Sequence, residues 1–130
     1  MQLPRQILIV EDELELLECL RTYLTERGHA VLTASTVEEA LHRLAQATPD
    51  MALIDLQLPG GSGRTIVQAI RKRQLPTRVV IITGCPDLEL RRELLACGVT
   101  DYLFKPIQLR EINTLLATPV PVSTPPLSTP

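Results

Sequence analysis

Four short apolar runs, each bounded by polar residues, constrain the fold of this chain more than any other feature of its sequence. They cover residues 7–10, 51–54, 79–82 and 102–104, and a weaker run covers residues 29–33. None of the four strong runs alternates apolar with polar residues, as a strand with one exposed face would. Continuous aliphatic and β-branched runs of this length are typical of a parallel sheet that helices cover on both faces.

Segments with a helical pattern of apolar residues separate these runs, and we predict helices over residues 14–27, 36–47, 64–73, 87–97 and 109–117. In the second of these segments the apolar residues recur at the spacing that places them on one helix face. Ser35 and Glu38 fit a capping box at its start. We expect Pro86 in the first turn of the fourth helix, where a proline removes no helical hydrogen bond.

The succession of strand and helix, repeated five times, predicts an α/β fold: a doubly wound (βα)5 domain with right-handed crossovers. We expect a five-stranded parallel sheet in the flavodoxin-like order 2-1-3-4-5, counting the strands along the chain. A chain of 130 residues suits one domain. We assign residues 1–117 to that domain, and residues 118–130, which hold five prolines and no charge, to a flexible tail or linker.

The composition argues against several classes of protein. A net charge of −2 gives no general attraction to nucleic acid, and we expect no direct binding to it. No apolar run is long enough for a membrane span. The three cysteines stand far apart without a CxxC pair, which favours free thiols in the cytoplasm over disulfides or a zinc site. We interpret one group of basic residues as a solvated face: Arg64, Arg71, Lys72, Arg73 and Arg78.

Polar residues follow each of the four strong strands, and in chain order they are Glu11 with Asp12, then Asp55, Thr83 and Lys105. The carboxyl ends of parallel strands share one edge of the sheet. Open α/β sheets bind ligands at that edge, where neighbouring strands send their connections to opposite faces. In the order 2-1-3-4-5 the first and third strands meet at this point. We therefore expect Glu11, Asp12 and Asp55 in one pocket.

Three carboxylates in one pocket repel one another unless their pKa values rise or a cation neutralises them. A site made only of oxygen ligands suits Mg²⁺ better than zinc or copper. The ammonium of Lys105 and the hydroxyl of Thr83 would complete a site that can hold a phosphoryl group during transfer, because each phosphoryl oxygen then has a partner. Asp55 would be the nucleophile that forms an acyl phosphate.

Four motifs follow one another along the chain: ILIVEDE, ALIDLQLPGGSG, VVIITG and GVTDYLFKP. In this order and spacing they make residues 5–117 resemble the receiver domain of two-component response regulators. The resemblance implies a phosphorylation-controlled signalling domain whose phosphoryl donor is a phosphohistidine on a sensor histidine kinase or a phosphotransfer domain. It implies self-catalysed phosphotransfer and autodephosphorylation only, so we do not expect an enzyme in the usual sense.

The resemblance also implies which residues hold the phosphoryl group and the metal. Asp55 matches the phospho-acceptor, which is also a ligand of Mg²⁺. Asp12 matches the acidic residue that contacts the ion directly, and Glu11 matches the neighbour that usually acts through water. Gln57 would contribute its backbone carbonyl to the ion. The acidic pair is Glu-Asp here where many members have Asp-Asp.

Further roles follow from the same resemblance. Thr83 matches the switch hydroxyl that turns toward the phosphoryl group, and Lys105 matches the lysine that pairs with it. The peptide bond after Lys105 is usually cis in the family. Tyr102 matches the aromatic residue that rotates inward on activation, although ordinary core packing is an alternative role for it. Gln57 and Cys85 occupy the two positions that tune how fast water removes the phosphoryl group.

We therefore predict a phosphorylation-controlled switch whose output face consists of residues 87–97, 102–104 and 109–117. The sequence leaves open which partner reads this face and whether the chain forms a homodimer through it. It also leaves open whether the chain is complete or cut from a longer regulator. The alternative interpretation is a module of the same fold that binds other proteins independently of phosphorylation.

Two other functions for this sheet order fit the sequence poorly. A phosphatase or phosphotransferase like the haloacid dehalogenases needs a second aspartate two residues after the nucleophile, and Gln57 at that position cannot act as the acid or base. A flavin-binding module needs a phosphate-cradling loop rich in Gly, Ser or Thr after the first strand. The acidic EDELEL sequence there would repel a phosphate unless a metal ion intervened.

Overall fold

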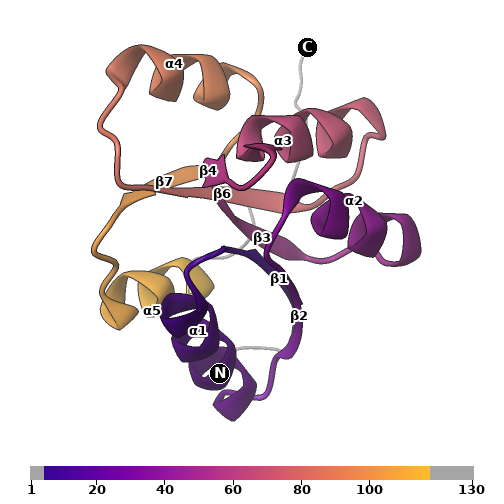
Figure 1. Cartoon of the computed structure of the whole chain (residues 1–130). Coiled ribbons are helices and arrows are strands. Elements are labelled where there is room, and N and C mark those ends of the chain that lie inside the picture. Colours follow the sequence, from indigo (N-terminus) through magenta and orange to yellow (C-terminus); the bar gives the residue numbers. More distant parts are fainter. Residues whose placement is uncertain (1–4, 118–130) are drawn as a thin grey trace, which may run out of the picture.

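The computed structural model describes residues 5–117. Its elements, labelled as in Figure 1, are β1 (Gln6–Val10), α1 (Leu14–Glu26), β2 (Ala30–Ala34), α2 (Val37–Gln46), β3 (Met51–Asp55), β4 (Gln57–Leu58), β5 (Gly61–Ser62), α3 (Gly63–Lys72), β6 (Arg78–Thr83), α4 (Leu88–Ala96), β7 (Asp101–Phe104) and α5 (Leu109–Ala117). The main sheet has the order β2-β1-β3-β6-β7, and every pairing in it is parallel. This is the predicted order, since β4 and β5 form a separate antiparallel pair.

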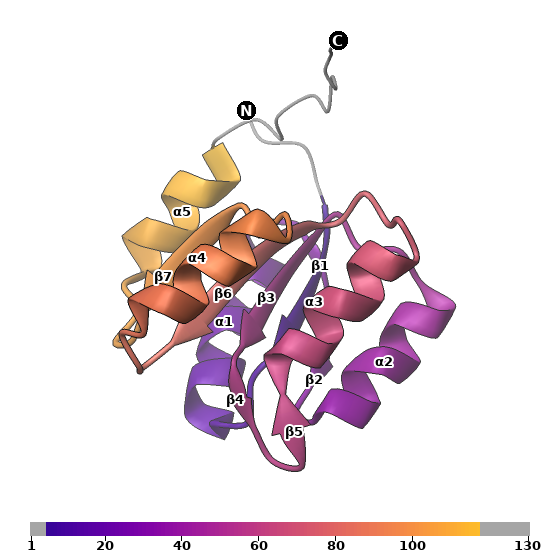
Figure 2. The same cartoon turned by 90° about the horizontal axis from the view of Figure 1, so that it is seen from above.

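Helices cover both faces of the sheet. Figure 2 shows α2, α3 and α4 on one face and α1 and α5 on the other. Each layer of helices closes over its own apolar core, and side chains alternate between the two cores along the central strands. In β1, for example, Leu8 and Val10 face one core while Ile7 and Ile9 face the other. This arrangement confirms the doubly wound fold predicted from the continuous apolar runs.

The edge strands are less buried than their apolar runs predicted. The central strand β3 and its neighbour β6 are buried along their whole length. In β7, by contrast, Leu103 is half-buried and Phe104 is exposed. The prediction that this run is buried on both faces was wrong, because β7 has a neighbouring strand on one side only.

Two helices begin one residue later than their sequence signals indicated. Thr36, not Ser35, caps α2, and its hydroxyl accepts the backbone N–H of Glu39 at 3.1 Å. The Glu39 carboxylate in turn accepts the backbone N–H of Ser35. At α4 the cap is Asp87, whose carboxylate accepts the N–H of Leu90, so Pro86 lies before the helix rather than in its first turn.

The glycine-rich segment after β3 forms a tight hairpin that the sequence did not predict. Leu58 pairs with Gly61 across a turn whose two central residues are Pro59 and Gly60. Gly60 has φ +77°, and proline followed by a glycine with positive φ is the signature of a type II turn. The hairpin carries Gln57 to the rim of the sheet edge where the polar strand ends meet.

The basic residues interpreted as a solvated face have structural roles in three cases. Arg73 donates to the carbonyl of Leu44 near the end of α2. Arg71 donates to carbonyls at the ends of α3 and α4. Arg78 is buried, pairs with Asp101 at 2.9 Å and donates to the carbonyl of Leu115 in α5. That interpretation was therefore wrong for Arg78, which is buried, whereas Arg73 is exposed and Arg71 is half-buried. All three donate to carbonyls at or just beyond the ends of helices, where the helix itself supplies no partner.

None of the helices that the structure describes is long and apolar enough to cross a membrane. The predicted flexible tail, residues 118–130, lies outside the described part of the chain. The three cysteines are free and exposed in the structure.

Candidate functional site

The ends of the central strands bring the predicted polar residues to one edge of the sheet. Val10 pairs with Ile54, so Glu11, which follows β1, lies beside Asp55, the last residue of β3. Asp55 in turn pairs with Ile82, one residue before Thr83 at the end of β6. The sequence-predicted cluster is therefore assembled by strand register alone.

Lys105 joins this cluster from the loop after β7. Its ammonium nitrogen Nζ lies 2.9 Å from Asp55 Oδ2, 3.1 Å from Glu11 Oε2 and 3.7 Å from Glu13 Oε1. Partial burial alone would lower the pKa of Lys105, but its hydrogen bonds to Asp55 and Glu11 raise it to about 12. The lysine is therefore a permanent cation at physiological pH. The peptide bond that follows it is cis, as expected.

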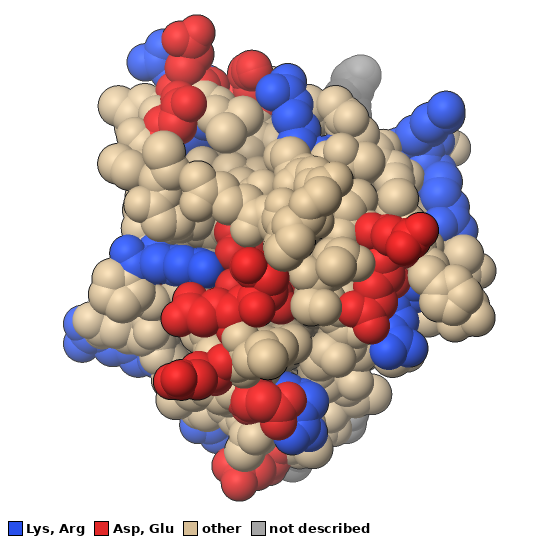
Figure 3. Space-filling view, in the orientation of Figure 1, with Lys and Arg blue, Asp and Glu red and all other residues tan. Residues whose placement is uncertain are grey.

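The three carboxylates form a compact acidic group. Glu11, Asp12 and Asp55 each offer one oxygen, and these oxygens all lie within 4.8 Å of one another. Glu11 and Asp55 are buried, whereas Asp12 is exposed. Figure 3 shows acidic side chains gathered near the centre of this face of the molecule. One lysine cannot neutralise so many carboxylates at such short range, so the group can accept a cation.

Burial disfavours the charged form of Glu11. Burial, with a smaller effect from the neighbouring Asp55 charge, raises the pKa of Glu11 from 4.5 to about 7. One of its oxygens, Oε2, accepts hydrogen bonds from Lys105 and the backbone N–H of Glu13. The other, Oε1, is buried without a hydrogen-bond partner among the described residues. An unpaired carboxylate oxygen on a residue of an acidic cluster is a natural ligand for a hard cation.

We expect Glu11→Gln to stabilise the metal-free protein at pH 8 by about 1 kcal/mol. Because the folded protein holds the Glu11 proton more tightly than the unfolded chain does, stability from this group is present below pH 4.5 and is lost as the pH rises to about 7. Urea unfolding in the presence of a chelator, at several pH values from 5 to 8, measures the difference.

The stabilisation by Glu11→Gln should grow with pH from about 4.5 to about 7. The exposed Glu15 in the first turn of α1 supplies the control, and Glu15→Gln should show no such trend. A difference between Glu11→Gln and the wild type that stays constant across the pH range would contradict the assignment.

The backbone around Asp55 fixes both of its carboxylate oxygens. Oδ1 accepts the backbone N–H of Gln57 at 2.9 Å, while Oδ2 accepts the ammonium of Lys105. Gly63, the first residue of α3, donates its N–H to the carbonyl of Leu56 and packs directly against the backbone of Asp55. Sequence reasoning missed Gly63, because nothing in PGGSG distinguishes the glycine that lies against β3 from the glycine that makes the turn.

Thr83 and Tyr102 differ in their position relative to the acidic group. Thr83 is buried at the end of β6, and its hydroxyl accepts the backbone N–H of Cys85 at 3.1 Å. Tyr102 lies in the core, with its ring 5.4 Å from that of Phe104, and its buried hydroxyl has no partner among the described residues. Burial raises the pKa of Tyr102. The structure therefore joins Thr83 to the rim of the site but does not bring Tyr102 into contact with the acidic group.

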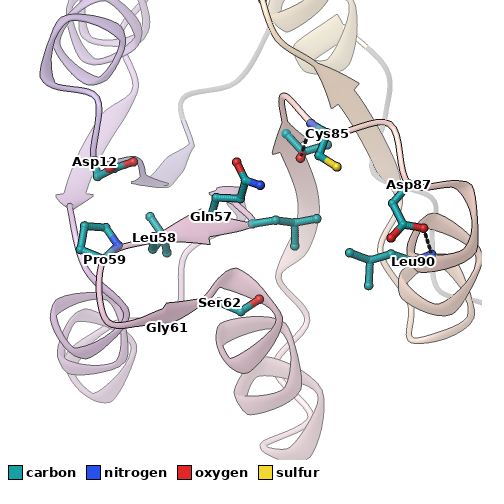
Figure 4. A pocket seen from close by; sticks show the side chains of 11 residues that line it. Asp12, Gln57, Leu58, Pro59, Gly61, Ser62, Cys85, Asp87 and Leu90 are labelled. Atoms are coloured by element: carbon teal, nitrogen blue, oxygen red, sulfur yellow. Dashed lines mark hydrogen bonds between the residues drawn. The ribbon is translucent and has the colours of Figure 1, made fainter.

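A cavity of about 760 Å³ opens beside the acidic group. Figure 4 shows the hairpin with Gln57, Leu58 and Pro59 on one side and the loop with Cys85 and Asp87 on the other. Asp12 lies at one end of the cavity, and Thr83 also lines it. A small phosphorylated group or a water molecule can therefore approach the end of β3 through this opening.

The family model of the response regulator receiver domain matches residues 7–117. The chain therefore belongs to the receiver domains of two-component response regulators. It is 38% identical over 111 residues to the two-component response regulator PhoP of Pseudomonas aeruginosa, covering 85% of this chain and 49% of PhoP. It is 34% identical over 112 residues to the acid tolerance regulatory protein ActR of Rhizobium meliloti, covering 86% of this chain and 58% of ActR. The chain thus spans about half the length of these curated relatives.

Solved structures agree with this assignment. A CheY-like receiver domain protein from Methanospirillum hungatei superposes with a TM-score of 0.79 at 27% identity, covering 88% of this chain and 94% of that one. A response regulator from Burkholderia pseudomallei superposes with a TM-score of 0.81 at 25% identity, covering 89% and 68%. That structure holds a phosphorylated aspartic acid, a calcium ion and citrate. Receiver domains are signalling domains, and this chain is one of them.

Proposed function

We propose that this domain accepts a phosphoryl group on Asp55 and passes the signal on through a change in its α4, β7 and α5 surface. The observation that carries the proposal is the position of Lys105, whose ammonium bridges the carboxylates of Asp55 and Glu11 at 2.9 and 3.1 Å. A lysine held in this way lies ready to pair with a phosphoryl oxygen once one is attached to Asp55. The Burkholderia pseudomallei relative with its phosphorylated aspartic acid supports the same reaction.

The acidic group fits Mg²⁺. Glu11, Asp12 and Asp55, with the backbone carbonyl of Gln57, would hold the ion, and the unpartnered Oε1 of Glu11 is one reason to expect it. When bound, Mg²⁺ neutralises negative charge on the phosphoryl oxygens. The calcium ion in the Burkholderia pseudomallei relative is a hard cation of the same kind.

The chain's own residues would carry the transfer. An oxygen of Asp55 attacks the phosphorus of a phosphohistidine on a sensor kinase or a phosphotransfer domain. The new O–P bond forms as the P–N bond breaks, and the donor imidazole leaves with the electron pair. Lys105 and Thr83 then pair with two phosphoryl oxygens, because charge spreads over all of these oxygens during transfer. The exchange with such a donor would take place in the cytoplasm.

Reorientation of Thr83 toward the phosphoryl group would break its present hydrogen bond from Cys85 and shift the loop before α4. Tyr102, which interacts electrostatically with Asp87 and Cys85 of this loop, would follow. The output surface already exposes apolar side chains from three elements: Leu88 and Leu95 of α4, Phe104 of β7 and Leu109 of α5. A partner domain or a second copy of this chain would read the change there.

The proposal is tested by incubating the wild type and Asp55→Asn with acetyl phosphate, with and without Mg²⁺, and measuring intact mass. We expect the wild type alone to gain one phosphoryl group, and only with Mg²⁺. A gain by Asp55→Asn, or no gain by either protein, would contradict the proposal. The second result would favour the module that binds partners independently of phosphorylation.

Gln57 and Cys85 are proposed to set the lifetime of the phosphorylated state. Both are exposed and line opposite sides of the cavity through which water reaches Asp55. We expect Gln57→Leu and Cys85→Leu to lengthen the half-life of the phosphoryl group several-fold, because each leucine side chain would exclude water from the path to the phosphoryl group. The decay of the intact-mass peak after removal of acetyl phosphate measures it. Thr65→Leu, at an exposed site on α3 away from the cavity lining, is the control. Unchanged half-lives would reject the assignment.

A further inference from the structure

Helix α4 packs against the sheet through few buried side chains. Leu94 is its one fully buried side chain, whereas α3, which covers the same face, buries Ile66, Val67 and Ile70. Leu88 in the first turn of α4 is 63% exposed. Helices that bury few apolar side chains are the parts of a domain that open most readily. Apart from Leu94 and the half-buried Leu90, core packing therefore contributes little to holding α4 in place.

Arg71 of α3 holds α4 at its C-terminal end. Its guanidinium donates from Nε to the carbonyl of Cys97 at 3.1 Å and from Nη2 to the carbonyl of Gly98 at 2.9 Å. The same side chain donates to the carbonyls of Leu75 and Thr77, at 3.5 and 3.3 Å, in the loop between α3 and β6. One side chain thereby ties the end of α4 to the chain segment that leads into the sheet.

The charge and shape of the guanidinium suit this position. A cation at a helix C-terminus is stabilised by the partial negative charge of the terminal carbonyls. The fork of Arg71 reaches several carbonyls at once, which the single ammonium of a lysine cannot do. Gly98, with φ +92°, leaves room for it, because a Cβ there would lie 2.8 Å from Nε of Arg71.

The opposite end of α4 is tied to the sheet by a weaker contact. The guanidinium of Arg91 lies over the rings of Tyr102 and Phe104 in β7, 5.7 and 6.0 Å from their centroids, and a cation–π contact at such distances contributes about 0.5 to 1 kcal/mol. The hydrogen bonds of this end stay within the helix and its cap, as in the bond from the Leu90 N–H to Asp87.

The nearest ion pair from α4 to another element, between Arg64 and Glu93 at 3.3 Å, lies midway along α4 with both partners exposed. An exposed pair of this kind contributes little. The more loosely held end is the end that follows Thr83 and borders the cavity.

We propose that Arg71 is the anchor of α4: it fixes the C-terminal end of the helix and leaves the end beside Thr83 freer to move. Helix α4 then turns about residues 97–98, and its more mobile end follows Thr83 and borders the cavity beside the acidic group. The link between this movement and phosphorylation rests on the function proposed above. The anchor itself does not, because it is a property of the unphosphorylated domain.

Amide hydrogen exchange followed by NMR tests the anchor in the unphosphorylated domain. In the wild type, the protection factors of Cys97 and Val99 should exceed those of Arg92 and Glu93. In Arg71→Met, which keeps an apolar stem but loses the donors, the protection of Cys97 and Val99 should fall by about tenfold or more, while that of the central strands stays unchanged. Arg71→Lys should lose most of the same protection, and it replaces Arg71→Met if that variant fails to fold.

Lys72→Met is the matched control, since it removes the same charge from an exposed neighbour on the same helix and should leave exchange unchanged. An equal fall in protection across the sheet in Arg71→Met, or no change at Cys97 and Val99, would overturn the anchor.

Phosphorylation with acetyl phosphate and Mg²⁺ forms a second arm of the experiment. Phosphorylation should change the amide exchange rates of residues 84–92 in the wild type. It should change those of residues 97–99 only in Arg71→Met. Absence of phosphoryl uptake would refute the proposed function. The exchange measured in the unphosphorylated variants would still decide whether Arg71 anchors α4, so the two failures are distinguishable.

Discussion

Replacement of Gly63 by alanine is expected to lower the free energy of unfolding by about 3 kcal/mol. A Cβ at this position would collide with the backbone carbonyl oxygen of Asp55 and would lie 2.8 Å from Cγ2 of Ile54. Backbone atoms of the central strand cannot move aside cheaply, so α3 would have to move away from β3. The hydrogen bond from the Gly63 N–H to Leu56 would be strained by that movement.

The same substitution should slow phosphorylation of Asp55. The carboxylate of Asp55 is held between the N–H of Gln57 and the ammonium of Lys105, and a shift of the backbone at residue 55 would disturb both contacts. Misplacement of a reacting group by about 1 Å costs on the order of a hundredfold in rate. We therefore expect Gly63→Ala to accept a phosphoryl group from acetyl phosphate about a hundredfold more slowly than the wild type.

Gly84→Ala is the control for both effects, because a Cβ at Gly84 would meet no atom within 4 Å. Urea unfolding and the rate of intact-mass gain should both be close to wild type in this variant. If Gly63→Ala matched Gly84→Ala in stability and rate, the close approach of α3 to Asp55 would not be the feature that positions the site.

Asp101→Ala is expected to destabilise the domain by about 2 to 3 kcal/mol, because it leaves the guanidinium of Arg78 in the interior without its carboxylate. The side chain of Arg78 is 5% exposed and that of Asp101 is 28% exposed, with 2.9 Å between Nη2 and Oδ2. The partial exposure of Asp101 places the expected cost below that of a fully buried pair. Urea unfolding at pH 7 measures it.

A double-mutant cycle separates the pair from the loss of either side chain alone. Arg78→Met also removes the donor to the Leu115 carbonyl, so it should be destabilising in its own right. In Arg78→Met with Asp101→Ala, however, the buried guanidinium is gone as well, and the loss should be clearly smaller than the sum of the single losses. Strict additivity would show that the two side chains do not depend on each other.

The sheet and the site could be predicted from the sequence because both depend on strand periodicity. The apolar runs of β1, β3 and β6 are continuous, and a polar residue ends each run, so Glu11, Asp55 and Thr83 meet once the strand order is known. Lys105 follows by the same logic from β7. The cis peptide bond after it was expected from the family resemblance and not from any physical pattern in the chain.

What the sequence could not supply are contacts between segments far apart in the chain. Arg71, Arg73 and Arg78 look like a solvated charge run, but each reaches a carbonyl between four and 37 residues away. The charge of an arginine does not show whether its side chain is solvated or caps a helix, because that depends on which element packs opposite it. Glu13 was missed for the same reason: its contact with Lys105 depends on how the loop after β7 approaches α1.

The capping errors have a local cause. Ser35 and Thr36 are both good cap residues, and Glu38 and Glu39 both lie three residues after one of them, so the sequence offers two equivalent boxes one residue apart. The strand β2 ends at Ala34 and fixes which of them is used. Boundaries of this kind are set by the neighbouring strand and not by the helix itself.

The central claim, that Asp55 is the residue that carries the phosphoryl group, is tested most directly by chemical mapping. The protein is incubated with acetyl phosphate and Mg²⁺, then treated with borohydride, which reduces an acyl phosphate to an alcohol, and finally digested and sequenced by mass spectrometry. We expect a reduced side chain at Asp55 and at no other aspartate or glutamate. Reduction at Asp12 or Glu11, or at no carboxylate in a protein that has gained phosphoryl mass, would contradict the claim.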